Sequence, residues 1–66
     1  MDILLNGQPR QIAEASTLLD LLNVEGLQQR RLAIEVNQQI IPRYQHAEHR
    51  LKPGDRVEIV QAMGGG

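Results

Sequence analysis

Apolar residues change their spacing twice along the chain, from strand-like to helical and back to strand-like. Residues 3–5 are apolar and are followed by Asn6 and Gly7. Asn-Gly favours a two-residue hairpin turn, because both turn positions need a positive φ. The pattern therefore predicts a hairpin whose second strand covers residues 8–13. Pro9 is expected near the start of that strand or at a sheet edge, since proline has no backbone N–H to donate.

A helix is predicted to begin after Ser16-Thr17. Thr17 and Asp20 have the spacing of a capping box, in which the side chain of each accepts a hydrogen bond from the backbone of the other. Asn23 and Gly26 are both candidates for the helix end, because both residue types tolerate the left-handed conformation that closes many helices. One helical face is expected to be apolar and carries Leu18, Leu21 and Leu22.

The second half of the chain reads as strands and turns. Residues 32–37 alternate apolar and polar side chains with period two, which is typical of a half-buried strand. Residues 40–41 are a short apolar segment that suits an edge strand. Residues 44–50 are expected to form a helical turn or an irregular loop. A Pro-Gly-Asp turn at residues 53–55 precedes the last predicted strand, residues 56–61.

The order of these elements predicts an α+β fold with a mixed sheet wrapped on one main helix, as in a β-grasp. The Asn-Gly hairpin is antiparallel, whereas a helical crossover favours a parallel neighbour. We expect the last strand to lie beside the first in the middle of the sheet. The whole chain, residues 1–66, is expected to be one domain, because a chain of 66 residues builds one small core and no more.

Composition excludes several classes of protein. The chain has no cysteine, which rules out disulfides, thiolate nucleophiles and zinc–cysteine sites. A net charge of −1 and a single aromatic residue argue against a nucleic-acid partner. No apolar run approaches the ~20 residues of a membrane helix, and the N-terminus does not resemble a signal peptide. We therefore expect a cytoplasmic protein with no membrane partner.

Candidate chemistry for a metal or a catalytic site is weak. His46 and His49 are three residues apart with Glu48 between them, and on a helical turn the two imidazoles would face one way. Two ligands are too few for a structural metal site. We interpret this segment as a solvated polar turn and expect no metal site, no bound cofactor and no catalytic residues.

The C-terminal end carries the candidate chemistry. Residues 62–66 are predicted to form a flexible tail, because glycine packs no side chain and orders poorly. The tail ends in Gly64, Gly65 and Gly66, and the α-carboxylate of Gly66 is its one reactive group. Adenylation by ATP would give that carboxylate a good leaving group, which a sulfur nucleophile would displace to leave a thiocarboxylate. Paired glycines also suit a narrow channel in a partner enzyme.

A partner-contact surface is predicted beside the tail. Side chains alternate across a strand, so Val57 and Ile59 are expected to face the helix and Val60 to face outward. Leu4 has the outward parity in the first strand. Together with Met63, these side chains would form an exposed apolar patch, a feature that often marks a protein contact.

The chain resembles the sulfur-carrier proteins of thiamine biosynthesis, the ThiS family of ubiquitin-like β-grasp proteins. The resemblance rests on residues 3–7, residues 33–43 with their Asn-x-x-Ile-x-Pro-Arg stretch, the Pro-Gly-Asp turn with the strand after it, and Gly65-Gly66. It implies a carrier and not an enzyme. A partner related to ubiquitin-activating enzymes would use ATP to adenylate Gly66. A cysteine desulfurase or a relay protein would supply sulfur, and thiazole synthase would receive it.

Three alternatives stay open at this point. The small subunit of molybdopterin synthase has the same tail chemistry with a different acceptor. A ubiquitin-like modifier would join Gly66 to a lysine amine. A non-catalytic β-grasp binding module would not use the tail, and the tail chemistry itself requires that Gly66 is the native last residue.

Overall fold

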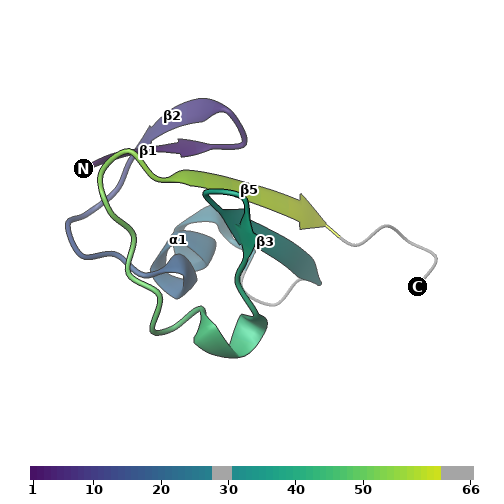
Figure 1. The fold of residues 1–66 in the computed structure, drawn as a ribbon. Coiled ribbons are helices and arrows are strands. Elements are labelled where there is room, and N and C mark those ends of the chain that lie inside the picture. The colour runs from purple at the N-terminus through teal and green to yellow at the C-terminus, as the bar shows by residue number, and fades with distance from the viewer. Residues whose placement is uncertain (28–30, 62–66) are drawn as a thin grey trace.

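A five-stranded mixed sheet with one helix on one face forms the body of the protein (Figure 1). The computed structural model describes residues 1–27 and 31–61. The elements in chain order are β1 (Asp2–Leu5), β2 (Gln8–Gln11), α1 (Leu18–Glu25), β3 (Leu32–Val36), β4 (Gln39–Ile40), the 3₁₀ turn η1 (Arg43–Gln45) and β5 (Arg56–Gln61). The predicted flexible tail, residues 62–66, lies outside the described residues.

Strand β5 occupies the centre of the sheet, whose order is β2-β1-β5-β3-β4. It runs parallel to β1, with Leu4 opposite Arg56 and Leu5 opposite Val57. It runs antiparallel to β3 along the whole length of β3. The predicted position of the last strand beside the first is therefore confirmed. The sheet mixes parallel and antiparallel pairs, as predicted from the hairpin and the crossover.

The predicted Asn-Gly hairpin joins β1 to β2. Leu5 is opposite Gln8, so the turn consists of Asn6 and Gly7, with φ values of 49° and 81°. Strand β2 is shorter than the expected residues 8–13 and ends at Gln11. The reason is the length of its partner, because β1 begins at Asp2, which is the residue opposite Gln11.

Helix α1 has both predicted end signals. The Thr17 hydroxyl accepts a hydrogen bond from Asp20 N at 3.1 Å, and the Asp20 carboxylate accepts one from Thr17 N at 2.9 Å. This reciprocal pair satisfies backbone donors that have no partner within the helix. Gly26 closes the helix with φ of 72°, and its N–H reaches the carbonyls of Leu22 and Asn23. Gly26 is thus the cap, and Asn23 is an ordinary helical residue.

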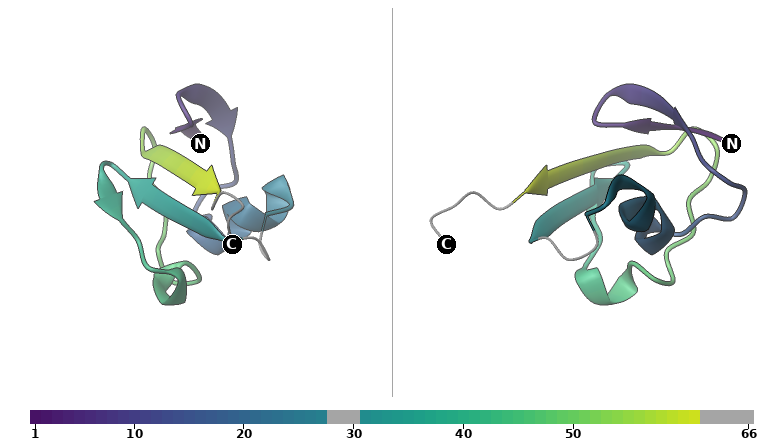
Figure 2. Two further views of the ribbon diagram at one scale, coloured as in Figure 1. Left: turned by 90° about the vertical axis from the view of Figure 1, so that its right-hand side faces the viewer. Right: turned by 180° about the vertical axis from the view of Figure 1, so that it is seen from behind.

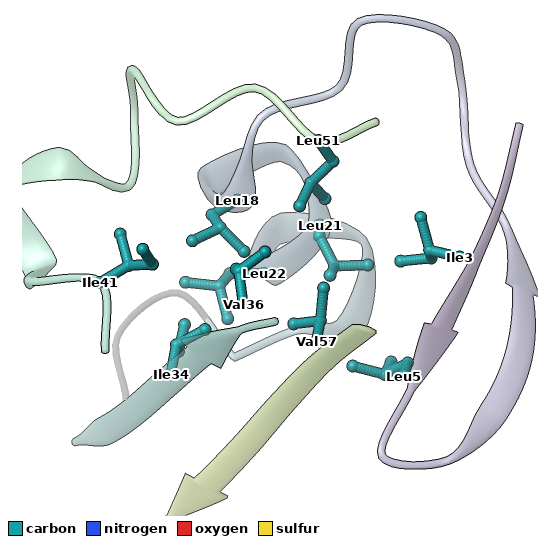
Figure 3. Packing of buried hydrophobic residues seen from close by; sticks show 10 residues of the cluster. All are labelled: Ile3, Leu5, Leu18, Leu21, Leu22, Ile34, Val36, Ile41, Leu51 and Val57. Atoms are coloured by element: carbon teal, nitrogen blue, oxygen red, sulfur yellow. The ribbon is translucent and has the colours of Figure 1, made fainter. Parts of the chain in front are cut away.

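The core lies between α1 and the inner face of the sheet (Figure 3). Leucines of the helix meet side chains of β1, β3 and β5, and the period-two pattern of the strands places these side chains on one face. Ile41 and Leu51, from the segments on either side of η1, complete the core around the helix leucines (Figure 3). The buried apolar residues are Ile3, Leu5, Leu18, Leu21, Leu22, Ile34, Val36, Ile41, Leu51 and Val57.

The segment after β4 is not the solvated turn that we expected. His46 is buried, and its Nε2 lies 2.9 Å from the carbonyl oxygen of Ile41. The backbone carbonyls of His46 and His49 accept hydrogen bonds from the N–H groups of Leu19 and Leu18, at 3.1 and 3.0 Å. The first turn of a helix leaves such donors without a partner in the helix. The loop therefore covers the N-terminal end of α1 and supplies hydrogen-bond acceptors to its first turn.

Candidate functional site

The candidate site is the C-terminal end of β5, which is the strand that leads to residues 62–66 (Figure 1). Strand β1 pairs with only the first two residues of β5. Strand β3 pairs with β5 as far as Gln61, which is opposite Leu32. Residues 58–61 of β5 are therefore paired with β3 on one side. On the other side they have no β1 residue opposite them, and support comes from the turn that follows β1.

Asn6 supports β5 on the β1 side. Its backbone N–H donates to the carbonyl of Val57 at 2.8 Å, and its side-chain Oδ1 accepts from Ile59 N at 2.8 Å. The side-chain amide thus stands in for the backbone carbonyl of a further β1 residue. Paired backbone groups are strongly preferred, so this contact extends the sheet beyond the last residue of β1.

Asn37 supports β5 on the β3 side, at the strand's beginning. Its backbone N–H donates to the carbonyl of Arg56 at 2.8 Å, and its Oδ1 accepts from Arg56 N at 3.0 Å. Its Nδ2 donates to Asp55 Oδ1 at 3.0 Å, and Asp55 Oδ2 also accepts from Lys52 N at 2.8 Å. This network fixes the turn that enters β5. Two asparagine side chains thus bind the backbone of the strand that precedes the terminal glycines.

The predicted site residues are placed only in part. Met63 and the three glycines, Gly64, Gly65 and Gly66, lie outside the described residues. Val60 is 62% exposed and pairs with Ala33 across β3, so it faces outward as predicted.

Leu4 also has the outward parity, but it is half-buried and lies beside Arg56 at the other end of β5. Arg56 and Val60 are four positions apart along β5, a separation of roughly 13 Å. The structure therefore does not bring Leu4 and Val60 into one patch.

Other functional features are few in the part of the chain that the structure describes. Residues 1–27 and 31–61 contain no group of three or more His, Asp or Glu side chains that could hold a metal ion. Within the same residues, the helix is too short and too polar to cross a membrane. On the helix side of β5, the side chain of Arg10 pairs with Glu25 and so links β2 to the end of α1.

The support of β5 by asparagine side chains is not evident from the sequence. The pattern identifies Asn6 and Asn37 only as turn residues, because asparagine is common in turns. The two asparagines directly follow β1 and β3, the strands on either side of β5. This position indicates that they contact β5 only when the strand order is already known.

Fold and site together define a ubiquitin-like β-grasp domain whose central strand leads to a glycine-terminated segment. The sequence model of the ThiS family matches residues 3–66. The chain is 39% identical to the sulfur carrier protein ThiS of Escherichia coli, with both chains covered completely. It matches the crystal structure of a thiamine biosynthesis protein (ThiS) from Geobacter metallireducens with a TM-score of 0.86, 30% identity and complete coverage of both chains.

A thiazole synthase of Paramagnetospirillum magneticum is 35% identical over all 66 residues, and the chain spans 20% of its length. The chain therefore belongs to the ThiS family. Members of this family are small sulfur carriers of thiamine biosynthesis and not enzymes. The predicted resemblance and the β-grasp fold are both confirmed.

Proposed function

We propose that this protein carries sulfur for thiazole formation as a thiocarboxylate on Gly66. The observation that carries the proposal is the match to the Escherichia coli sulfur carrier protein over the whole of both chains, at 39% identity. The match to the family extends through Gly66. The position of β5 also suits the proposal, because a strand supported on both sides is a rigid base for a segment that must enter another protein.

The proposed chemistry takes place on an adenylating partner and uses ATP. An oxygen of the Gly66 carboxylate attacks the α-phosphate of ATP and releases pyrophosphate. A sulfur nucleophile then attacks the acyl carbon, and a C–S bond forms as the bond to AMP breaks. The absence of a side chain on glycine leaves the acyl carbon open to attack. Residues 62–66 span at most ~17 Å, which is the depth to which the carboxylate could enter the partner.

Thiazole synthase is the proposed acceptor of the sulfur. The Paramagnetospirillum magneticum protein named thiazole synthase contains a segment that resembles this chain. A second thiazole synthase, from Magnetococcus marinus, is 33% identical to the chain over 20% of its own length. Joining a carrier and its acceptor in one polypeptide raises their effective concentration, which favours two proteins that work together. We place the reaction in the cytoplasm and assign sulfur supply to a cysteine desulfurase or a relay protein. Such a donor carries persulfide sulfur, so a thiol must reduce the acyl disulfide that first forms, and the thiocarboxylate is released as that thiol is oxidised to a disulfide.

Intact-mass spectrometry tests the proposal. The chain is incubated with ATP, a sulfide source and an adenylyltransferase related to ubiquitin-activating enzymes, and a Gly66 deletion is the matched control. The expected result is a mass gain of one oxygen replaced by one sulfur in the full chain and none in the control. No gain under conditions that load the Escherichia coli carrier would contradict the proposal.

A second step separates the acceptors. The loaded chain is mixed with thiazole synthase or with the large subunit of molybdopterin synthase, and loss of the added sulfur mass is followed. Loss with thiazole synthase alone is expected. Loss with the molybdopterin enzyme alone would move the protein to that pathway, and covalent conjugates to lysine in cells would make it a modifier.

A further inference from the structure

A cavity of about 230 Å³ lies between α1 and the segment that contains η1. Leu22 and His46 are buried at its base, whereas Arg43 and Ala47 are exposed, so the cavity opens to the surface. An apolar cavity of about 150 Å³ binds benzene, so this one has room for a single aromatic ring. Its lining is mostly apolar and consists of Leu19, Leu22, Leu32, Arg43, His46 and Ala47.

His46 supplies a hydrogen-bond acceptor to this cavity. The residue is only 5% exposed, and its Nε2 lies 2.9 Å from the carbonyl oxygen of Ile41. A carbonyl oxygen only accepts, so Nε2 carries the proton and Nδ1 of the neutral ring keeps a lone pair. Nδ1 has no hydrogen-bond partner within residues 1–27 and 31–61. No side-chain nitrogen or oxygen of those residues is both inaccessible and unpartnered, so Nδ1 is reached from the cavity that His46 lines.

A ring of matching chemistry projects from the same surface. Tyr44 is the only Phe, Tyr or Trp residue of the chain, and it lies in η1 between two residues of the cavity lining, Arg43 and His46. Its side chain is 80% exposed, so it does not fill its own cavity. The Tyr44 hydroxyl accepts a long hydrogen bond from Gln45 Nε2 at 3.5 Å, and its own proton remains available to an acceptor.

A ring and a cavity on one surface are what a symmetric dimer requires. In a two-fold dimer the same patch meets itself, so the ring of each copy can enter the cavity of the other. Both views in Figure 2 place the η1 turn, drawn in green, at the edge of the molecule opposite the β1–β2 hairpin. The segment carries charges of both signs, on Arg43, Glu48 and Arg50, so like charges do not dominate a contact between two copies.

We propose that two copies of the chain associate through this surface, with the Tyr44 ring of each seated in the cavity of the other and its hydroxyl donating to His46 Nδ1. Arg43 adds a cation at the rim, which the face of an aromatic ring attracts. Two tyrosine rings bury less area than a standard interface, so we expect a weak dimer with a dissociation constant on the order of 0.1 mM. The inference goes beyond the proposed function and does not depend on sulfur loading.

NMR of the full chain at a series of concentrations tests the proposal. Between micromolar and millimolar concentration, the amide signals of Leu22, His46 and Ala47 should shift, and the chain should tumble more slowly. In a mixture of labelled and unlabelled chains, NOEs should connect the Tyr44 ring of one copy to Leu22 methyl groups of the other. A chain that stays monomeric over this range would overturn the proposal.

Variants of the ring show which group makes the contact. Tyr44→Phe removes only the hydroxyl and should weaken association about tenfold, because two hydrogen bonds are lost in each dimer. Tyr44→Ala should abolish association. Val24→Ala is the matched control, since Val24 is 76% exposed but lies on α1 outside the cavity lining, and it should associate as the wild type does. Association that survives Tyr44→Ala would overturn the proposal.

A mixture of two variants tests the reciprocal contact. Ala47→Leu fills the cavity but keeps Tyr44, and it should not associate with itself. Labelled Tyr44→Ala keeps an open cavity, which the ring of an unlabelled Ala47→Leu chain can enter. Its Leu22 amide should therefore shift when Ala47→Leu is added and not when more Tyr44→Ala is added. Both substituted positions are exposed, and circular dichroism checks that both variants fold. No shift in the mixture would contradict the contact.

The tyrosine side-chain analogue p-cresol identifies the occupant. Added to the Tyr44→Ala chain, p-cresol should shift the Leu22 and Ala47 amides, and toluene, which lacks the hydroxyl, should bind about fivefold more weakly. If p-cresol binds while the wild-type chain remains monomeric, the cavity takes a tyrosine of a different protein, and self-association is refuted.

Discussion

The two hairpins of the sheet support β5 from opposite sides. They differ in how readily their turn residues adopt the positive φ that each turn requires. Both turns have two residues, and both residues of each turn have positive φ. The first turn is Asn6-Gly7, with φ values of 49° and 81°, and the second is Asn37-Gln38, with φ values of 52° and 70°. Positive φ is free of steric conflict in glycine but unfavourable in glutamine.

The asparagines of the two turns also differ in their partners. Among the residues that the structure describes, Asn6 bonds through its side-chain Oδ1 alone, which accepts from Ile59 N. Asn37 uses both ends of its amide, since Oδ1 accepts from Arg56 N and Nδ2 donates to the nearly buried carboxylate of Asp55. An acceptor alone suffices in the first turn, whereas the second needs an acceptor and a donor. The comparison shows that the same residue type in the same turn can have different chemical requirements.

Asn37→Asp removes the donor that only the second turn needs, and it should destabilise the protein more than any other variant considered. Aspartate keeps the acceptor but loses the donor, and it places a second carboxylate against Asp55. We expect the free energy of unfolding to fall by about 3 kcal/mol, because a hydrogen bond to a charged group is lost and like charges are brought together. Urea unfolding followed by circular dichroism measures the change. A loss below about 1 kcal/mol would show that Asp55 does not need the Asn37 donor.

Asn6→Ala is expected to cost less, about 2 kcal/mol. The variant removes one acceptor from Ile59 N and places alanine at a positive φ. Asn6→Asp is the matched control, because it keeps the acceptor and tolerates this backbone conformation. It should cost less than about 0.5 kcal/mol. Equal losses for Asn6→Asp and Asn37→Asp would remove the difference between the two turns.

Local features of the fold were predictable because each depends on residues that are close in sequence. The Asn-Gly turn, the capping box of Thr17 and the glycine cap of α1 all match the structure. Each consists of groups within about four positions of one another, so residue type and spacing determine the contact. The position of the last strand beside the first also followed, because few topologies connect a hairpin, a helix and further strands.

The site was harder to predict because its contacts join distant residues. Asn6 and Ile59 are 53 positions apart, and Asn37 and Arg56 are 19 apart. The pairing of Ala33 with Val60 depends on the register of β3 against β5, and a shift of one residue would bring different side chains together. The same cause explains the error for Leu4, since parity predicted its face and register decided its neighbour. The prediction that Gly66 is the reactive residue came from the composition of the C-terminal segment and from the family resemblance.

Gly7→Gln converts the first turn to the composition of the second. Glutamine at φ of 81° would be strained, so we expect the free energy of unfolding to fall by about 1 kcal/mol. Beyond the two neighbouring residues, no atom lies within 4 Å of the point that a Cβ would occupy, so backbone strain and not a steric clash determines the loss. Urea unfolding measures it, and Gly7→Asn, which tolerates positive φ better, should lose less. An equal loss in both variants would show that the requirement at residue 7 is not a backbone one.

Gln38→Gly makes the reverse exchange and has the smallest expected effect, a gain. Glycine removes the strain of glutamine at φ of 70°, worth about 1–2 kcal/mol. It also makes the unfolded chain more flexible, which opposes the gain by about 0.4–1 kcal/mol. The net stabilisation should be about 0.5–1 kcal/mol, measured by urea unfolding beside Gly7→Gln. Gln38→Asn is the control and should gain less than glycine. A destabilised Gln38→Gly would mean that the Gln38 side chain makes a contribution larger than its backbone strain, and the two turns would then differ in side-chain function as well as in conformation.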